Sequence, residues 1–406
     1  MSLARSAEGV RELAQLRLEQ RQDAGERFFV ANADALARLC HRMAERFARG
    51  GRLIAIGVSP AARSDVRHVA VEFVHPVIVG KRALPALGLT GESAGLAREL
   101  ALTCAGDDIV IAFGEPADGA ELAAAVTEAR ARGCLTIAFA PLGTEWELEP
   151  PVQDPFVRQE LVETAYHVLW ELVHVFFEHR GLLEGRTERR SRDAGASSFR
   201  YPFLSEGEHD LDAILADVGE SALMKSREIA KLRAATVERS VDALQSAAEA
   251  LRTSLDGGGR LLALGNGGSA TDAMDVVADF VSAPGDPGWP SRPALDLTAD
   301  TAIITAIAND IGVEAIFARQ IIAYGRAGDV LLVLSTSGNS LSVLDALAEG
   351  RRRAMVTIAL VGYDGGRVAS EALADHVIIA PSQHIPRIQE AQATAYHLLR
   401  ELVEVE

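Results

Sequence analysis

The stretch LGNGGSATD at residues 264–272 decides the fold, because it passes from a buried strand straight into a helix. Before it, residues 260–264 form a short apolar run headed by the glycines at 257–259, which predicts a strand. After it, residues 270–281 are apolar at helical spacing. A glycine-rich turn at this junction aims backbone N–H groups outward at the positive end of the helix, so it is a ready site for a phosphate.

A second loop of this kind is STSGNS at residues 335–340, which follows the apolar run 330–334 and precedes a helix from Leu341. Its four hydroxyls, with backbone donors behind them, suit a phosphate monoester. One glycine-rich turn is often only a tight connection, but two such turns at strand ends in one domain favour a phosphate site. The residues expected to bind it are Asn266, Gly267, Ser269, Ser335, Thr336, Ser337 and Ser340.

Length and composition indicate two globular domains. At 406 residues the chain can bury two cores, and its net charge of −17 argues against nucleic-acid and anionic-membrane partners. Residues 1–21 are charged and helical in pattern, unlike a signal peptide, and no apolar run is long enough to span a membrane. The spacing of Cys40, Cys104 and Cys134 is not that of metal ligands, so we expect reduced, mostly buried cysteines in a cytoplasmic protein.

The chain contains an internal repeat, and three stretches of the first half return in the second. They are GRLIAIG (51–57) as GRLLALG (259–265), SDVRHVAVEF (64–73) as TDAMDVVADF (271–280), and TAYH (164–167) as TAYH (394–397). A spacing of roughly 210 to 230 residues is too long for a solenoid and indicates a duplicated domain.

The order of the predicted elements makes each copy an α/β domain. Strands that alternate with helices imply a mostly parallel sheet covered by helices on both faces, in three αβα layers. Residues 6–50 are expected to form two helices with a break near Asn32. The segment 185–207, rich in Arg and Ser, is expected to link a first domain at 1–184 to a second at 208–406.

The two copies differ in their loops. The first half has VSPA at 58–61 and GEPADG at 114–119 where the second half has its two phosphate-type loops. It therefore lacks the loop hydroxyls and gains an acid, Glu115, that would repel phosphate. It also has no counterpart of Asn309-Asp310, a pair that could equally be a simple turn. We expect phosphate to bind only through the loops of the second half.

His68 and Glu72 lie four residues apart on a predicted helix and therefore on one face. This spacing suits joint metal ligation, or a base held beside a metal, but a surface ion pair has the same spacing. Asp275 and Asp279 occupy the same positions in the second copy, where two acids on a solvated helix are also an ordinary pattern.

His167 and His397 lie on the apolar C-terminal helices of their copies. A single buried histidine is more often a hydrogen-bonded core residue than a catalyst. The recurrence of histidine together with a glutamine, Gln159 in one copy and Gln389 in the other, favours a functional role.

With these residues in hand, the sequence resembles the phosphoheptose (sedoheptulose 7-phosphate) isomerase family of sugar isomerase (SIS) domains. The resemblance is close over about residues 260–401 and fainter over the first half. The motifs that carry it are residues 265–269, NDIG at 309–312, residues 335–340, and RIQE at 387–390 with His397. It implies two tandem SIS-type domains. The implied activity is that of an aldose–ketose isomerase acting through an enediol, with sedoheptulose 7-phosphate as the expected substrate.

The resemblance also implies roles for particular side chains. In that family the loop serines hold the sugar phosphate, a glutamate on the helix after the first loop is the base, and a histidine on the last helix is the acid. Asp310 and Gln389 are expected to contact the substrate. Some members bind zinc, so we expect a divalent metal, Zn²⁺. The implied ligands are His68, Glu72, Gln159 and His167, or alternatively Asp275, Asp279, Gln389 and His397.

Helix geometry favours a site assembled from both copies. At about 1.5 Å per residue, Asp279 lies roughly 15 Å along its helix from Ser269, far from a phosphate on its own loop. We therefore expect phosphate to bind the second half while His68 and Glu72 of a first half reach its sugar. The expected catalytic residues are Glu72, His397, His167 and, as the alternative base, Asp279.

Two other functions stay open. A non-catalytic phosphosugar-binding module, regulatory or part of an assembly, fits the loss of the His/Glu pair from the loop-bearing copy. Retention of His68 and Glu72 in a copy without phosphate loops favours catalysis. Nucleotide binding is disfavoured, because the spaced glycines and acidic ribose ligand of a dinucleotide site are missing. The expected partners are a phosphorylated sugar and further copies of this chain, a dimer of tandem chains imitating a tetramer.

Overall fold

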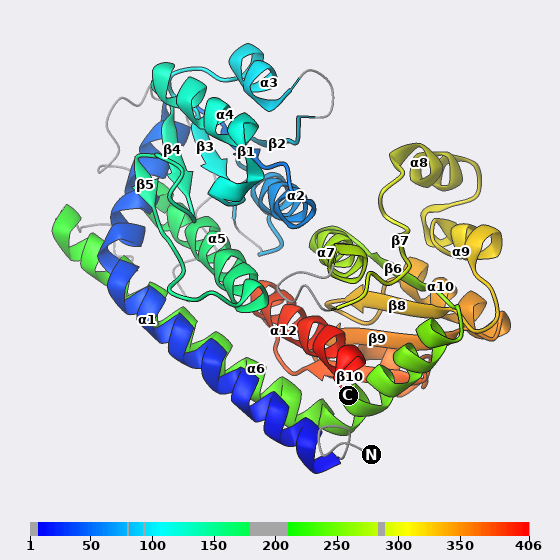
Figure 1. Ribbon diagram of the computed structural model, residues 1–406. Helices are drawn as coiled ribbons and strands as arrows, with labels where there is room; N and C mark the ends of the chain where they lie inside the picture. Colours follow the sequence, from blue (N-terminus) through cyan, green and yellow to red (C-terminus); the bar gives the residue numbers. More distant parts are fainter. Residues whose placement is uncertain (1–6, 79–80, 92–94, 179–209, 283–288, 406) are drawn as a thin grey trace. The chain divides into compact units, whose positions relative to one another are not determined.

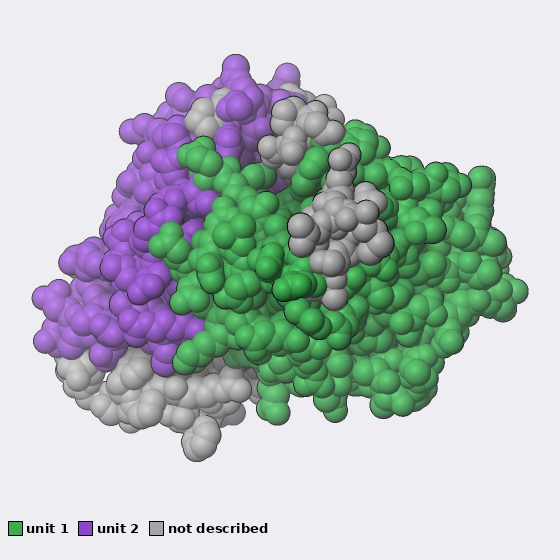
Figure 2. Space-filling view, turned by 60° about the horizontal axis from the view of Figure 1, so that its bottom comes forward, with its two compact units in different colours: residues 1–23, 153–160, 228–406 green, residues 24–152, 161–227 purple. Residues whose placement is uncertain are grey.

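The computed structural model describes residues 7–78, 81–91, 95–178, 210–282 and 289–405 (Figure 1). The chain divides into two compact units (Figure 2). Unit 1 comprises residues 1–23, 153–160 and 228–406, and unit 2 comprises residues 24–152 and 161–227. The predicted linker, 185–207, lies outside the described residues, and the predicted domain bounds remain a prediction.

Three long helices run through residues of both units. Helix α1 (Ala7–Ala48) and helix α5 (Pro155–Glu178) begin in unit 1 and continue in unit 2, whereas helix α6 (Leu211–Asp256) begins in unit 2. As a result, unit 1 contains the first turns of α5, which belong to the first half of the sequence. This exchange brings first-half side chains into the second-half fold.

Unit 2 contains a five-stranded sheet in which every pairing is parallel. Its strand order is β2-β1-β3-β4-β5. The strands are β1 (Leu53–Ile56), β2 (Ala86–Leu89), β3 (Ile109–Ala112), β4 (Leu135–Ala138) and β5 (Trp146–Glu147). Three shorter helices pack around it: α2 (Pro60–Val74), α3 (Leu96–Thr103) and α4 (Ala120–Ala131).

Unit 1 contains a second five-stranded parallel sheet, in the order β10-β9-β8-β6-β7. Its strands are β6 (Leu261–Gly265), β7 (Ala294–Asp296), β8 (Val330–Ser335), β9 (Val356–Gly362) and β10 (His376–Ala380). Read in the opposite direction, the order is β7-β6-β8-β9-β10, which is the order of unit 2 with β6 in the place of β1 and β7 in the place of β2. The predicted duplication of a parallel α/β domain is therefore confirmed. In such a sheet the winding reverses between β6 and β8, and ligands bind beyond the carboxyl ends of the strands at that point.

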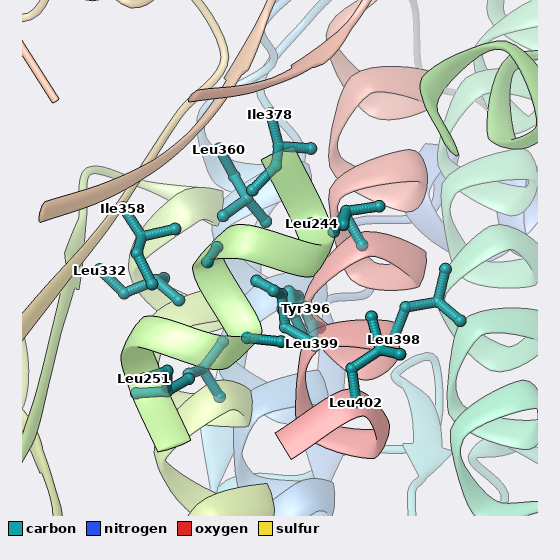
Figure 3. Close-up of a cluster of buried hydrophobic side chains, with 14 of the residues drawn as sticks. Leu244, Leu251, Leu332, Ile358, Leu360, Ile378, Tyr396, Leu398, Leu399 and Leu402 are labelled. Atoms are coloured by element: carbon teal, nitrogen blue, oxygen red, sulfur yellow. The ribbon is translucent and has the colours of Figure 1, made fainter. Parts of the chain in front are cut away.

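Both faces of the unit 1 sheet are covered by helices. Successive side chains of a strand point to opposite faces, and in this sheet apolar side chains lie on both. Figure 3 shows one face, where Leu332, Ile358 and Leu360 of the sheet pack against Leu244 of α6 and Leu399 of α12 (Ile385–Glu404). Helix α7 (Gly268–Ser282) joins this face. The other face packs against α9 (Ala318–Tyr324) and α10 (Leu341–Arg352). Two further helices are α8 (Thr301–Asp310) and α11 (Gly366–Ser370).

The expected break near Asn32 is wrong, because α1 is continuous from Ala7 to Ala48. The Asn32 amide donates a hydrogen bond to the Phe28 carbonyl at 2.8 Å, one turn back, and Asp34 pairs with Arg38 at 2.9 Å along the same helix. These local contacts let a residue that favours helix caps lie inside a helix.

All three cysteines are buried and free, so their prediction as buried residues is confirmed. Among the described residues, no helix combines the length and the apolar character needed to cross a membrane.

Candidate functional site

The two predicted loops meet at the reversal point of the unit 1 sheet. The loop after β6 leads directly into α7 at Gly268, and the loop after β8 leads into α10 at Leu341. A hydrogen bond joins the two segments: the Asn266 amide donates to the Ser342 hydroxyl at 3.0 Å. Two helix N-termini therefore meet beyond the carboxyl ends of β6 and β8, where their positive ends favour an anion.

The serine-rich loop is held in one shape by its own backbone. The Gly338 N–H donates to the Ser335 hydroxyl at 3.1 Å, and the Asn339 N–H donates to the Ser337 hydroxyl at 3.2 Å. Gly338 has a φ of +62°, and a Cβ there would lie 2.3 Å from the Gly365 carbonyl oxygen. The Ser340 side chain makes no capping hydrogen bond at the start of α10, so its hydroxyl is available to a ligand.

The equivalent position in unit 2 holds a carboxylate of the protein itself. The Asp118 carboxylate accepts a hydrogen bond from the Glu115 N–H at 2.8 Å and another from the Ser59 hydroxyl at 3.4 Å. These donors belong to the loops that follow β3 and β1. An internal anion already occupies donors that a phosphate would need, and Asp118 rather than Glu115 supplies it.

A polar centre in unit 1 joins three helices around His397 of α12. Asp275 and Asp279 come from α7, and Gln159 and Glu160 come from the start of α5. The Gln159 amide donates to Asp275 Oδ2 at 2.9 Å. All of these side chains except Gln159 are less than a tenth exposed. First-half and second-half residues thus form one cluster, whose first-half members are Gln159 and Glu160.

His397 lies between two carboxylates. Its Nδ1 is 2.8 Å from Glu160 Oε1, and its Nε2 is 3.4 Å from Asp279 Oδ2. A neutral imidazole carries a single N–H, so the second carboxylate is satisfied only when the ring holds a second proton. Burial opposes that charge, but Asp279 and Glu160 outweigh it and raise the pKa of His397 to about 9. The two carboxylates therefore favour the protonated form of the His397 ring.

A second centre lies within unit 2, where His68 of α2 meets Glu163 and His167 of α5. The three ligand atoms all lie within 4.8 Å of one another, and all three residues are buried. Burial, together with the neighbouring His167, lowers the pKa of His68 well below its usual value, so its imidazole is neutral. Neutral imidazoles and a carboxylate are the ligands that zinc prefers.

The spacing of the two rings fits a tetrahedral metal. His68 Nε2 and His167 Nε2 are 3.4 Å apart. Two nitrogens that each lie about 2.0–2.1 Å from a tetrahedral zinc are separated by about 3.3 Å. Of the predicted metal set, His68 and His167 lie in this group with Glu163, Glu72 is buried on α2, and Gln159 bonds Asp275 in unit 1.

The remaining predicted residues lie on the surface or within α12. Asp310 is exposed at the end of α8, where its carboxylate accepts from the Asn309 amide at 2.8 Å. Gln389 is buried on α12.

Three residues of these centres were not among the predicted site residues. Glu163 lies four residues before His167, the same spacing that identified His68 and Glu72, so it could have been found. Glu160 has no such spacing, because its partner His397 lies far away in the sequence. Asp118 has none either, because its partner Glu115 belongs to the same turn.

Comparison with known proteins places this architecture among sugar-phosphate enzymes. The SIS domain family matches residues 226–362. The phosphoheptose isomerase of Bradyrhizobium sp. (strain ORS 278) is 41% identical over 184 residues, which cover 44% of this chain and 91% of the relative. The phosphoheptose isomerase of Geobacter sulfurreducens is 46% identical over 163 residues, which cover 40% of this chain and 84% of the relative.

Two solved structures match nearly the whole chain. The C-terminal domain of glucosamine-fructose-6-phosphate aminotransferase from Francisella tularensis has a TM-score of 0.58 at 11% identity, covering 96% of this chain and 94% of that one. The tagatose-6-phosphate ketose/aldose isomerase of Escherichia coli has a TM-score of 0.54 at 15% identity, covering 96% of this chain and 92% of that one. At these identities the likeness is one of fold, and it extends over both halves.

Proposed function

This chain belongs to the phosphoheptose isomerase family and is a phosphosugar isomerase, and we propose that its substrate is sedoheptulose 7-phosphate, which it converts to an aldose heptose 7-phosphate. One observation carries the proposal. A glycine-rich loop after β6 and a hydroxyl-rich loop after β8 meet where the winding of the parallel sheet reverses, and each leads into a helix N-terminus.

The phosphate docks on the unit 1 loops. Backbone N–H groups at the start of α7 and the side chains of the serine loop supply donors to its oxygens. The residues that we assign to the phosphate are Asn266, Gly267, Ser269, Ser335, Thr336, Ser337 and Ser340. We assign Asp310 and Gln389 to the sugar. Because the phosphate is remote from the reacting carbons, its binding positions the sugar without taking part in bond changes.

The reaction moves a proton between neighbouring carbons. A carboxylate takes the proton from C1 of the ketose while an acid protonates the carbonyl oxygen at C2, which gives an enediol. Loss of the O1 proton and protonation of C2 then give the aldose. We assign the acid to His397, which the two neighbouring carboxylates keep protonated, with His167 as the second candidate.

Two carboxylates are candidates for the base. Asp279 lies 3.4 Å from His397, so unit 1 itself offers a base beside an acid. Glu72 takes the equivalent position in the first copy, where the family pattern has its glutamate. We favour Asp279 because it lies beside the acid His397. Since Asp279 lies roughly 15 Å along α7 from Ser269, we assign the phosphate of the sugar that it serves to the unit 1 loops of another copy of the chain.

We also propose that a divalent metal, Zn²⁺, binds His68, Glu163 and His167. When bound there, such an ion would supply Lewis-acid chemistry.

Exposed apolar residues support the proposal that copies of this chain associate. In unit 1, the segment that follows α8 exposes Ile311 by 55% and Val313 by 63%, and Tyr324 at the end of α9 is 37% exposed. Where exposed apolar residues form one patch, they mark an interaction surface in soluble proteins. Light scattering that gives the mass of a single chain at micromolar concentration would argue against association.

A second candidate function is a non-catalytic phosphosugar-binding module. The observation that favours it is the replacement of the expected His/Glu pair by Asp275 and Asp279 in the copy that carries the loops. Such a module would bind the same sugars through the same loops, with no conversion.

The test is an isomerase assay of the full chain with sedoheptulose 7-phosphate and with free sedoheptulose. We expect conversion of the phosphorylated sugar alone. Ser337→Ala should raise KM roughly 10- to 100-fold, because a hydrogen bond to a charged phosphate is lost. Ser59→Ala, which removes a hydroxyl from the first-half loop after β1, should leave KM unchanged. Binding without conversion would favour the second candidate.

A further inference from the structure

Glu160 is a fully buried carboxylate in unit 1, and both of its oxygens are bound. Arg21 of α1 holds it from one side, with Nη2 2.8 Å from Oε1 and Nε 3.0 Å from Oε2. The Thr394 hydroxyl donates to Oε2 at 2.6 Å, and Arg233 Nε lies 3.6 Å from the same oxygen. Two guanidinium groups compensate the buried negative charge, so the carboxylate has one stable position.

That position fixes the His397 ring. His397 Nδ1 is 2.8 Å from Glu160 Oε1, and the ring stacks on Phe156 with centroids 4.5 Å apart and planes 23° apart. With Nδ1 bound on one side and the ring stacked on Phe156, Nε2 lies 3.4 Å from Asp279 Oδ2. A flip of the ring would break the contact with Glu160.

We propose that Glu160 is a positioning residue for His397, and that the first half of the chain thereby completes the centre of the second half. Both Glu160 and its main partner, Arg21, precede the second SIS copy in the sequence. Glu160 touches no reacting atom; it holds the ring so that Nε2 serves the sugar. The effect on turnover rests on the proposed function, whereas the effect on the ring does not.

Glu160 joins α5 to α12. It reaches His397, 237 residues away in sequence, and it accepts a hydrogen bond from Thr394 of the same helix. Its counterpart in the repeat, Glu390, accepts a hydrogen bond from Arg387 at 2.8 Å.

The experiment compares the full chain with Glu160→Gln, which keeps the side-chain shape and removes the charge. We expect kcat to fall roughly 10- to 100-fold with KM unchanged, the scale seen when a carboxylate that orients a histidine is lost. In ¹⁵N-histidine NMR without substrate, the Nδ1–H signal of His397, assigned with His397→Gln, should shift and exchange faster with water.

Asp329→Asn is the matched control, because Asp329 is a buried acid that binds the Arg260 backbone at 2.9 Å and the Arg260 guanidinium at 3.3 Å, at the amino end of β8. It should lower stability without moving kcat or the His397 signal. If Glu160→Gln does not fold, Thr394→Val removes one bond to Glu160 and should shift the same signal in the same direction by less.

Glu160→Gln with wild-type kcat and an unmoved ring signal would overturn the proposal, as would Asp329→Asn reproducing both effects. If the wild-type chain converts no sugar phosphate yet the ring signal shifts in Glu160→Gln, the positioning stands and the proposed function fails.

Discussion

His68 Nε2 lies 3.4 Å from His167 Nε2 in unit 2, with Glu163 completing a group of three buried ligands. The equivalent histidine of the second copy, His397, instead faces two carboxylates. The repeated histidine therefore has different partners in the two copies: His167 lies beside a second imidazole and a carboxylate, and His397 lies between two carboxylates.

The first prediction is that unit 2 binds one transition-metal ion per chain. Titration calorimetry with Zn²⁺, and visible absorption with Co²⁺ as the probe, should show one site of tetrahedral type. His68→Ala and Glu163→Gln should each weaken binding by at least roughly tenfold to hundredfold, because a ligand is lost. Asp279→Asn serves as the control. If that variant alone abolishes binding, the alternative set in the second copy holds the metal.

The second prediction concerns pH. The pKa of His397 is raised in the folded chain from 6.5 to about 9, so its protonation stabilises the fold. The contribution is fully present below pH 6.5 and is lost as the pH rises through 9. A shift of this size corresponds to about 3 kcal/mol.

Urea unfolding of the wild type and of His397→Gln measures this effect. The stability advantage of the wild type should be about 3 kcal/mol smaller at pH 10 than at pH 6. An advantage that does not change with pH would show that His397 has the same pKa in the folded and unfolded chains.

The third prediction compares two glycines of the phosphate loops. Gly338 and Gly267 have φ values of +62° and +60°, so alanine at either position costs roughly 1–2 kcal/mol in backbone strain. A Cβ at Gly338 would also lie 2.3 Å from the Gly365 carbonyl oxygen, whereas a Cβ at Gly267 meets nothing within 4 Å. Gly338→Ala should therefore lower Tm further and impair sugar-phosphate binding more, as thermal unfolding and calorimetry would reveal. Equal effects would mean that contact with Gly365 does not shape the loop.

The fourth prediction separates the two candidate bases. Asp279→Asn should lower kcat roughly 10²- to 10⁴-fold, the usual contribution of a general base, with a smaller change in KM. Glu72→Gln should have the smaller effect on kcat in steady-state assays with sedoheptulose 7-phosphate. The opposite ranking would move the base to the first copy, as the sequence pattern alone favoured.

Much of this arrangement follows from local sequence. The strands 261–265 and 330–335 are apolar runs bounded by glycine and hydroxyl residues, so their place before helices could be predicted. The repeat GRLIAIG and GRLLALG implied a duplicated domain, and the two sheets have the same strand order. The loops were predictable because turn chemistry depends on residues that are adjacent in sequence.

The partners of His397 could not be predicted in the same way. Glu160 meets His397 across 237 residues, and the contact depends on the path that α5 takes into unit 1. Periodicity shows which face of a helix is apolar, but not which distant helix a buried charge will meet. The break expected at Asn32 failed for a related reason, because a hydrogen bond to Phe28 overrides its preference for helix ends.

The central claim is proton-transfer isomerisation of a sugar phosphate held on the second-half loops. The most direct test is NMR of the full chain in D₂O with ketose phosphates of five to seven carbons. Our account predicts that sedoheptulose 7-phosphate yields an aldose 7-phosphate, with deuterium at the carbons beside the carbonyl. A sugar phosphate that binds, as seen from its ³¹P signal, yet gives neither aldose nor deuterium at carbon, would contradict it.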